Sequence, residues 1–312
     1  MNRTKIEWVR NPDGSQGYTW NPITGCLNHV NGLCKGGSFP CYAYKLAHGR
    51  LSSKYLAGGI VVSEGKDHEN LSDPFYPRFW KERLNDLPQI GLRVPWSKER
   101  GIFVCDMGDL FGTSIPEEWT RRLLERMKAY GEHRFYLLTK QPQRLPEFSP
   151  FPENCWVGVT ATNAEMFKRA CNELHGIEAA VKFVSVEPLL SWDWHDDKTD
   201  DPMSPAGTVM DYMDDTLDWL IIGACTGSSW EMVKLGERYN RDLTEPSAMT
   251  RLSTKWTLQP RIEWLREIVE AADKAQIPVF LKDNLKPLIG QNLGHTFPGF
   301  AYKEHLRQEM PK

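Results

Sequence analysis

The chain has 312 residues, which is enough for one large domain with a sizeable core or for two smaller ones. Its 38 lysines and arginines nearly balance its 41 aspartates and glutamates, which excludes a strong overall field toward nucleic acid or an anionic membrane. The cysteine count of 7 is odd, and no apolar run is long enough for a signal core or a membrane span. We therefore expect a cytoplasmic protein in a reducing compartment.

Short apolar runs rich in β-branched and aromatic residues recur along the chain, as is typical of buried parallel strands. They are found at residues 18–20, 102–105, 135–138, 156–159, 181–186, 219–222 and 279–281. Segments with apolar residues at helical spacing lie between them, at 117–130, 163–175 and 260–275. This alternation predicts an α/β fold with a parallel sheet covered by helices. The strand number favours a full or partial (β/α) barrel, formed by residues 1–312 as a single domain, over an open doubly wound sheet.

Polar residues and glycines stand at the carboxyl ends of the predicted strands, where (β/α) barrels carry their functional groups. They are Asp106, Asp109, Thr139, Lys140, Thr160, Ser185, Glu187, Gly223 and Lys282. A carboxylate such as Glu187 at the end of a buried strand is costly without a partner, which favours a functional role. Two residues keep a second interpretation: Thr160 as the cap of the helix that begins at 163, and Ser185 as a satisfied core hydroxyl.

Three cysteines, Cys26, Cys34 and Cys41, lie within sixteen residues directly after the first predicted strand. Three thiolates on one loop make a metal site with one open position, because an iron–sulfur cubane normally takes four. A closed zinc site with His29 or His48 as the fourth ligand is an alternative, as are three unrelated thiols. The remaining cysteines are expected to be buried free thiols: Cys105, Cys155, Cys171 and Cys225.

Two segments interrupt the alternation of strands and helices. Residues 191–217 carry many aspartates and are expected to form a solvated insertion rather than a metal site. Residues 230–257 hold several lysines and arginines together with Trp230 and Trp256, a composition that suits contact with a polyanion.

The chain resembles a phage-associated, three-cysteine family of uncharacterised radical S-adenosylmethionine (SAM) proteins. The likeness rests first on the start motif Trp-Asn-Pro-Ile-Thr-Gly-Cys at 20–26 and on Cys-Tyr-Ala at 41–43. It continues through the motifs at 103–111, 137–140, 157–160, 184–190 and 279–282, and so covers most of the chain. The chain departs from the family pattern in having six residues between Cys34 and Cys41 instead of two. It also has Gly-Ala-Cys-Thr-Gly at 223–227 and Lys-Asp-Asn at 282–284, where relatives carry Gly-Gly-Glu-Ser-Gly and Lys-Gln-Trp-Gly.

The resemblance implies that Cys26, Cys34 and Cys41 ligate three irons of a [4Fe-4S] cluster, while the fourth iron binds the amino and carboxylate groups of SAM. One electron from the reduced cluster would cleave SAM to methionine and a 5′-deoxyadenosyl radical. Asp106 and Asp109 would accept a hydrogen bond from the SAM amino group.

The resemblance also implies that the hydroxyl groups and lysines at the strand ends contact the cofactor. Thr139, Thr160 and Ser185 would meet the ribose or the carboxylate of SAM. Lys140 and Lys282 would pair with the SAM carboxylate or with a substrate phosphate.

Glu187 would hold ribose hydroxyls or a substrate amine, which makes it a candidate for both cofactor binding and catalysis. Gly223 and Gly227 would let the backbone approach the adenine, and Thr226 is grouped with them as a cofactor contact. Cys225 is a candidate hydrogen-atom donor to a substrate radical, with a small buried thiol as its alternative interpretation.

The predicted function is therefore a radical SAM enzyme that modifies or repairs a nucleobase or nucleic acid, with a flavodoxin- or ferredoxin-like protein as reductant. The alternative is a zinc-stabilised nucleic-acid-binding barrel without catalysis. A peptide or small-molecule substrate stays open beside the nucleic acid.

Overall fold

The apolar runs form the strands of one central sheet in the computed structural model, which describes residues 1–61, 69–87, 98–194, 208–245, 248–292, 301–302 and 305–311. The sheet has eight strands in the order β1-β2-β8-β9-β10-β11-β12-β16. Their bounds are Asn2–Arg3, Tyr18–Trp20, Gly101–Val104, Arg134–Thr139, Cys155–Ala161, Val181–Val186, Trp219–Ile222 and Val279–Leu281. β2 pairs with β8, β8 with β9, β11 with β12 and β12 with β16, all in parallel, whereas β1 joins β2 antiparallel. The predicted α/β class and its mostly parallel sheet are thus confirmed.

The order of the parallel strands follows the chain without reversal, as in a partial (β/α) barrel rather than a doubly wound sheet. β8, β10 and β12 are buried along their whole length. This burial explains why these strands read as continuous apolar runs instead of alternating patterns.

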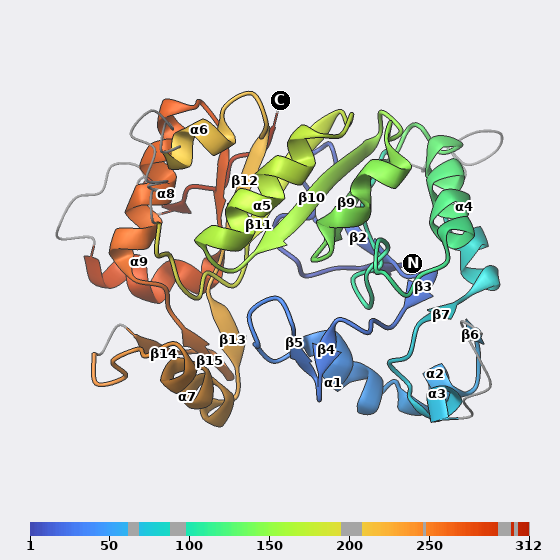
Figure 1. Cartoon of the computed structure of the whole chain (residues 1–312), viewed down its shortest axis with the longest axis horizontal. Coiled ribbons are helices and arrows are strands. Elements are labelled where there is room, and N and C mark those ends of the chain that lie inside the picture. The colour runs from blue at the N-terminus through green and yellow to red at the C-terminus, as the bar shows by residue number, and fades with distance from the viewer. Residues whose placement is uncertain are drawn as a thin grey trace, which may run out of the picture. The chain divides into compact units, whose positions relative to one another are not determined.

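The three predicted helices are α4 (Glu117–Lys128), α5 (Ala164–His175) and α8 (Ile262–Lys274), each with its apolar face buried. α5 packs against β11, and Figure 1 shows it lying across that strand. Asn163 caps α5, because its side chain accepts a hydrogen bond of 2.8 Å from the backbone N–H of Met166. The alternative interpretation of Thr160 as this cap is wrong, since Thr160 lies inside β10, which continues to Ala161.

The remaining elements are shorter. The other α-helices are α1 (Tyr42–His48), α2 (Ser52–Leu56), α3 (Glu69–Ser72), α6 (Val209–Met213), α7 (Ser229–Arg238) and α9 (Lys286–Asn292). The 3-10 helices are η1 (Lys81–Asp86), η2 (Pro142–Phe148) and η3 (Asp283–Leu285). The short strands are β3 (Ile23–Thr24), β4 (His29–Val30), β5 (Leu33–Cys34), β6 (Ile60–Val61), β7 (Arg78–Phe79), β13 (Cys225–Gly227), β14 (Met249–Leu252), β15 (Lys255–Leu258), β17 (Ala301–Tyr302) and β18 (His305–Leu306).

The chain divides into two compact units. Unit 1 comprises residues 1–35, 40–158 and 177–180, and unit 2 comprises residues 36–39, 159–176 and 181–312. The assignment of residues 1–312 to a single domain stays a prediction. Within the described part of the chain, no helix has both the length and the apolar character that a membrane crossing requires.

Both predicted insertions contain regular structure. In the first, residues 195–207 lie outside the described residues, and α6 follows with a capping box in which Thr208 and Asp211 each accept a hydrogen bond from the other's backbone N–H. The second forms a module of β13, α7, β14 and β15, in which β15 pairs antiparallel with both β13 and β14. Figure 1 shows this module in orange and brown, with α7 packed on its small sheet.

Candidate functional site

The start motif at residues 20–26 lies along the loop that follows β8. The backbone N–H of Cys105 donates to Trp20 O at 2.8 Å, and that of Gly25 donates to Met107 O at 2.9 Å. Asn21 adds a side-chain bond, because its Oδ1 accepts from the Met107 N–H at 3.0 Å. The motif therefore acts first as a backbone connector that holds the start of the cysteine loop against the end of a buried strand.

Position 25, directly before Cys26, requires a glycine. Its φ of +87° lies in the left-handed region, and an added Cβ would come within 2.5 Å of the carbonyl oxygens of Phe75 and Tyr76. The next N–H, that of Cys26, donates to Phe75 O at 3.1 Å. Backbone contacts on both sides thus determine where the first cysteine stands.

Cys34 is presented by a β-hairpin. β4 and β5 pair antiparallel with His29 opposite Cys34, and the turn residues Asn31 and Gly32 have φ values of 48° and 78°. Positive φ at both central positions, with the pair Asn-Gly, is the type I′ turn that suits two-residue hairpins. The Cys41 N–H donates to Gly32 O at 2.9 Å, so the turn also positions the third cysteine.

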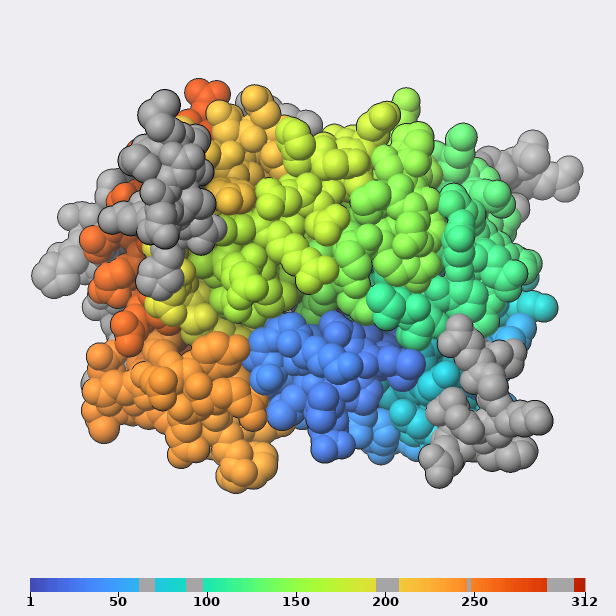
Figure 2. Space-filling model, in the orientation of Figure 1, coloured from blue at the N-terminus to red at the C-terminus, as the bar shows by residue number. Residues whose placement is uncertain are grey.

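Cys41 is the residue before the first turn of α1. Its backbone is extended, and the next side chain, Tyr42, donates its hydroxyl to the carbonyl of Asp106. Cys34 is buried, whereas Cys26 and Cys41 are half-buried. Figure 2 shows the blue N-terminal segment, which contains the cysteine loop, reaching the surface of unit 1.

The three thiols are electrostatic neighbours. Burial, first of all, raises the pKa of Cys26 to about 12, and the charges of Asp109, Cys34 and Cys41 raise it further, while the Asn28 N–H at 3.3 Å from the sulfur lowers it. Cys26 and Cys41 also pack against the same apolar cluster, which consists of Ala43, Ala47, Tyr55, Phe75, Trp80 and Met107. Because thiols bind metals as thiolates, metal binding at this loop must release protons.

The spacing of these ligands differs between a single ion and a cluster. Four sulfurs around one zinc ion lie about 3.8 Å apart, given zinc–sulfur bonds of about 2.3 Å. Cubane thiolates bind different irons and stand further apart. Among the described residues, no three Cys, His, Asp or Glu side chains converge closely enough to hold one ion. Three thiols on one loop are donors that suit either metal centre, and the assignment of a cluster stays a prediction.

The two histidines considered as fourth zinc ligands occupy other environments. His48 Nε2 lies 3.2 Å from Asp73 Oδ1, and its Nδ1 lies 3.1 Å from the carbonyl oxygen of Tyr44. The His29 ring packs against Tyr44 and Phe75, and burial lowers its pKa. Its Nε2 is buried and has no hydrogen-bond partner among the residues that the structure describes.

Asp106 and Asp109 follow β8, as predicted, but their surroundings differ. Asp106 Oδ1 accepts from Asn21 Nδ2 at 2.5 Å, and burial raises the pKa of this carboxyl group. Asp109 is buried and accepts from Thr139 Oγ1 at 2.8 Å, from the Lys140 N–H at 3.1 Å and from the Phe111 N–H at 3.1 Å. Burial raises its pKa as well, since it outweighs these hydrogen bonds.

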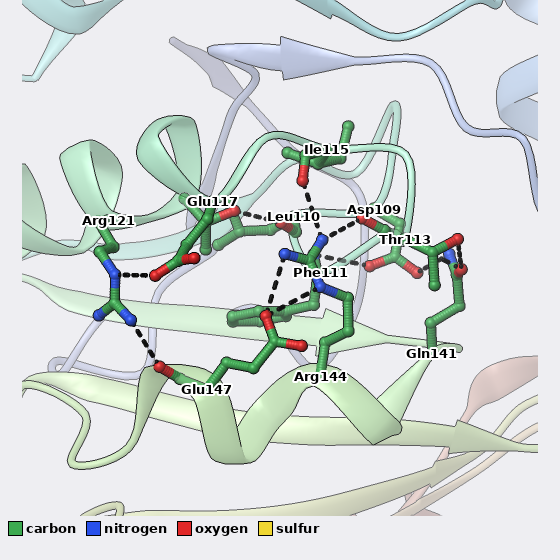
Figure 3. A network of polar contacts seen from close by, with 12 residues as sticks. Asp109, Leu110, Phe111, Thr113, Ile115, Glu117, Arg121, Gln141, Arg144 and Glu147 are labelled. Atoms are coloured by element: carbon green, nitrogen blue, oxygen red, sulfur yellow. Dashed lines mark hydrogen bonds and ion pairs between the residues drawn. The ribbon is translucent and has the colours of Figure 1, made fainter. Parts of the chain in front are cut away.

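The Asp109 contacts belong to a network that shapes the loop after β8. Gln141 Oε1 accepts from the N–H and the hydroxyl of Thr113, at 3.2 and 3.1 Å. Arg144 Nη1 donates to the carbonyls of Gly112 and Ile115, at 2.6 and 2.9 Å, and Figure 3 shows its guanidinium group reaching into that loop. Thr139 also accepts from the Gln141 N–H at 2.9 Å. Asp109 and Thr139 therefore bind each other, and their assignment as SAM contacts stays a prediction.

The strand-end residues of unit 2 meet around Gly223. Lys282 Nζ forms an ion pair with Glu187 Oε1, and the two side chains are 14% and 25% exposed. A Cβ added to Gly223 would lie 3.0 Å from Lys282 Cδ and 3.2 Å from Glu187 Cγ. The glycine between them in the sheet order thus leaves room for the pair to form. Sequence analysis singled out all three residues without connecting them.

Ser185 and Thr160 are both buried in strands of unit 2. The Ser185 hydroxyl is fully buried and lacks a hydrogen-bond partner among the described residues, so its interpretation as a satisfied core hydroxyl is wrong there. Ser185 lies in β11, and Glu187 directly follows the end of that strand. A buried hydroxyl without a partner among the described residues is a candidate ligand contact.

Two amides that sequence analysis missed complete this region. Asn284 accepts from the Ala224 N–H at 3.0 Å and donates to the Ala224 carbonyl at 2.8 Å. Gln259 is fully buried and donates to the Asn284 carbonyl at 2.8 Å, while its own Oε1 has no partner among the described residues. The only sequence signal was the Lys-Asp-Asn departure at 282–284.

Cys225 and Thr226 belong to β13. Cys225 is buried in an apolar cluster with Leu190, Met232, Leu235 and Leu258. This packing supports its interpretation as a small buried thiol. Thr226 is exposed, opposite Thr257 of β15. The roles assigned to both residues in cofactor binding and catalysis stay predictions.

A scan against family models matches residues 3–251 to "Protein of unknown function (DUF5131)". The chain belongs to this family. The family description names no activity, so the radical SAM activity and the phage association stay predictions. No curated protein matches the sequence.

Solved structures give weak similarity to this DUF5131 member. It aligns with spore photoproduct lyase complexed with dinucleoside spore photoproduct at 11% identity, over 90% of this chain and 78% of the other, with a TM-score of 0.45. A doubly substituted variant of that enzyme, with bound AdoMet and dinucleoside spore photoproduct, gives 12% identity, coverages of 90% and 80%, and a TM-score of 0.45. A variant of the enzyme with a single tyrosine-to-phenylalanine substitution aligns at 11% identity. The alignment covers 90% of this chain and 78% of the other, with a TM-score of 0.46.

Proposed function

We propose that the protein is a radical SAM enzyme whose [4Fe-4S] cluster is held by Cys26, Cys34 and Cys41. The observation that carries this proposal is the placement of the three thiols on one loop, where Cys26 and Cys41 pack against the same apolar cluster and the turn before Cys34 also binds the backbone of Cys41. All three lie on the loop that follows the first parallel strand, held by backbone hydrogen bonds and a type I′ turn. Three protein thiolates leave one iron of a cubane open for a cofactor.

The residues around the thiols suit this role. When bound, a reduced cluster of this kind supplies the electron that splits SAM into methionine and a 5′-deoxyadenosyl radical, which takes a hydrogen atom from the substrate. Cys26 and Cys41 pack against an apolar cluster, and apolar surroundings influence the potential of a bound metal centre. The Asn28 N–H directed at Cys26 Sγ favours the thiolate form, and such bonds tune the potential of iron–sulfur centres. Tyr42 and Asn21 hold the backbone of residues 106–107 beside this loop.

The polar residues of unit 2 are proposed as contacts for the cofactor or the substrate. Ser185 offers a buried hydroxyl without a partner among the described residues, and Glu187 and Lys282 offer opposite charges next to one another. Lys282 is proposed to bind a carboxylate or a phosphate, and Glu187 the ribose hydroxyls or an amine. Asp109 and Thr139 are proposed to support the loop that carries Asp106.

The proposed substrate is a nucleobase within a nucleic acid, and the proposed electron donor is a flavodoxin- or ferredoxin-like protein. Support for the substrate comes from α7, where Trp230 is 66% exposed and Lys234 Nζ lies 4.1 Å from its ring centroid. An exposed indole beside a cation offers both stacking and charge to a single strand.

Anaerobic reconstitution with iron and sulfide tests the cluster. The expected result is about four irons per chain, as one cubane requires, together with 5′-deoxyadenosine after addition of dithionite and SAM. Single alanine variants of Cys26, Cys34 and Cys41 should lose both. The matched control is Cys171→Ala, which removes a buried thiol from α5 and should keep both. Bound zinc without iron in the wild-type protein would contradict the proposal and favour a binding protein.

Titration with a single-stranded oligonucleotide tests the substrate class. Trp230→Ala should weaken binding about tenfold or more, because one base–aromatic stack contributes about 1–3 kcal/mol. Trp264→Ala is a control on α8, a different helix. Equal affinity of wild-type and Trp230→Ala proteins at low salt would remove the support for a nucleic-acid substrate.

A further inference from the structure

The residues between the second and third cysteines are held by unit 2 through their backbone. We call residues 36–39 the strap; they lie between Cys34 and Cys41 in the chain, and they cluster with unit 2. Three successive strap carbonyls each accept a hydrogen bond from a side chain. Thr162 Oγ1 donates to Gly36 O at 3.1 Å, Tyr239 OH donates to Gly37 O at 2.8 Å, and Arg238 Nη1 donates to Ser38 O.

Packing contacts of Phe39 and Gly37 also hold the strap. Phe39 packs against the apolar cluster of Leu190, Cys225, Met232, Leu235 and Leu258. Gly37 has a φ of +121°, and a Cβ there would lie 2.6 Å from Thr162 Oγ1. The strap is therefore held by specific hydrogen bonds and packing contacts, although the interval between Cys34 and Cys41 is long.

The three anchors come from two separate elements. Thr162 directly follows β10, is fully buried, and also has Met166 Sδ at 3.2 Å as a weaker second acceptor. Arg238 ends α7, and Tyr239 is its C-cap. The module of β13, α7, β14 and β15 thus supplies two of the three bonds to the strap, as well as most of the apolar cluster around Phe39.

The anchors act on the cysteines through the covalent chain. Only Lys35 separates Cys34 from the strap, and only Pro40 separates the strap from Cys41. Ordering each strap residue costs backbone entropy of the same order as one net hydrogen bond contributes. The loss of one anchor should therefore change the population of the held strap about fivefold, and the loss of two by more.

We propose that Thr162, Arg238 and Tyr239 are positioning residues that set the distance between Cys34 and Cys41 by holding the strap. This inference rests on the proposed function, because it concerns thiols that hold a cluster. The Arg238–Tyr239 end of α7 then links the second insertion of the chain to the metal loop.

The first test uses the metal-free full chain. Variants Thr162→Val and Tyr239→Phe remove one hydroxyl each, and Thr162→Ser keeps its hydroxyl. The readouts are tryptic cleavage at the exposed Lys35, followed by mass spectrometry, and amide hydrogen exchange across residues 35–41. In the double variant Thr162→Val/Tyr239→Phe, cleavage at Lys35 and amide exchange across residues 35–41 should both be at least fivefold faster than in the wild type. Both rates in Thr162→Ser should be close to those of the wild type. The control Tyr18→Phe alters a half-buried tyrosine of β2 and should change neither rate. Unchanged rates in the double variant would overturn the proposal.

The second test uses reconstituted protein and a spectroscopic readout. Electron paramagnetic resonance should show a larger share of three-iron clusters in the double variant, and a chelator should remove its iron at least fivefold faster. The single variant Thr162→Ser, which keeps its hydroxyl, should match the wild type in both properties. Equal cluster loss in all variants would overturn the positioning role alone, whereas a wild-type protein that takes up no iron overturns the proposed function and this role with it.

Discussion

The cysteine loop of unit 1 and the strand-end set of unit 2 are built in opposite ways. The cysteine loop is held by contacts between backbone atoms. A Cβ on Gly25 would clash with the carbonyl oxygens of Phe75 and Tyr76, and the Cys26 N–H donates to Phe75 O. In the strand-end set, side chains meet: Glu187 pairs with Lys282 over Gly223. A region held by backbone contacts cannot adjust to a change, whereas paired side chains can separate to admit a ligand.

This difference matches what the two regions are proposed to do. Metal ligands must be held at defined positions before the metal arrives, and loss of that order lowers affinity. A charged pair near a bound molecule can exchange its internal partner for one on the ligand. We therefore expect the cysteine loop to tolerate substitutions less well than the strand-end set.

The largest effect is expected for Gly25→Ala. The added Cβ would lie 2.5 Å from two backbone oxygens at a φ of +87°, so the free energy of unfolding should fall by about 3 kcal/mol or more. Gly14→Ala is the matched control, because Gly14 has a φ of +80° but no atom within 4 Å of the added Cβ. The control should cost about 1–2 kcal/mol. Equal losses in urea unfolding would show that the backbone around Gly25 is not rigid.

A medium effect is expected for Lys282→Met. This change leaves the carboxylate of Glu187 without its 14%-exposed ammonium partner, which should cost about 1.5–3 kcal/mol of unfolding free energy. The double variant with Glu187→Gln should be less destabilised than the sum of the single variants. Strict additivity in that double-mutant cycle would mean that the pair contributes nothing as a unit.

The smallest effect is expected for Gly223→Ala. The nearest atoms to the added Cβ are Lys282 Cδ at 3.0 Å and Glu187 Cγ at 3.2 Å, and both belong to side chains that can move. Unfolding free energy should change by less than about 1 kcal/mol. If Gly223→Ala proved as damaging as Gly25→Ala, the strand-end set would have to be as rigid as the cysteine loop.

The strands of the sheet could be predicted because parallel strands buried on both faces are continuous apolar runs, as in Ile102–Val104 and Trp219–Ile222. Polar residues at strand ends were also found by type and position. What each polar group binds could not be found, because partners such as Thr139 for Asp109 come from different strands. Asn284 and Gln259 were missed, since a single amide in a 3-10 helix or directly after a strand gives no periodic signal.

The six-residue interval between Cys34 and Cys41 illustrates the limit most clearly. Sequence comparison showed only that the interval is long. The residues that hold it, Thr162, Arg238 and Tyr239, are far away in the chain and have no motif in common. Local sequence patterns therefore identify the cysteine loop, while the residues that support it are found only from tertiary contacts.

The strap also has a consequence for biosynthesis. Its anchors Arg238 and Tyr239 are separated from Ser38 and Gly37 by 200 and 202 residues. A ribosome that adds about 5–20 residues per second needs about 10–40 s to cover that interval. During this time the three thiols have left the ribosome without the segment that holds them in register. The proposed cluster would therefore be loaded after the chain is finished, and oxygen met during translation would act on cysteines that the strap does not yet hold.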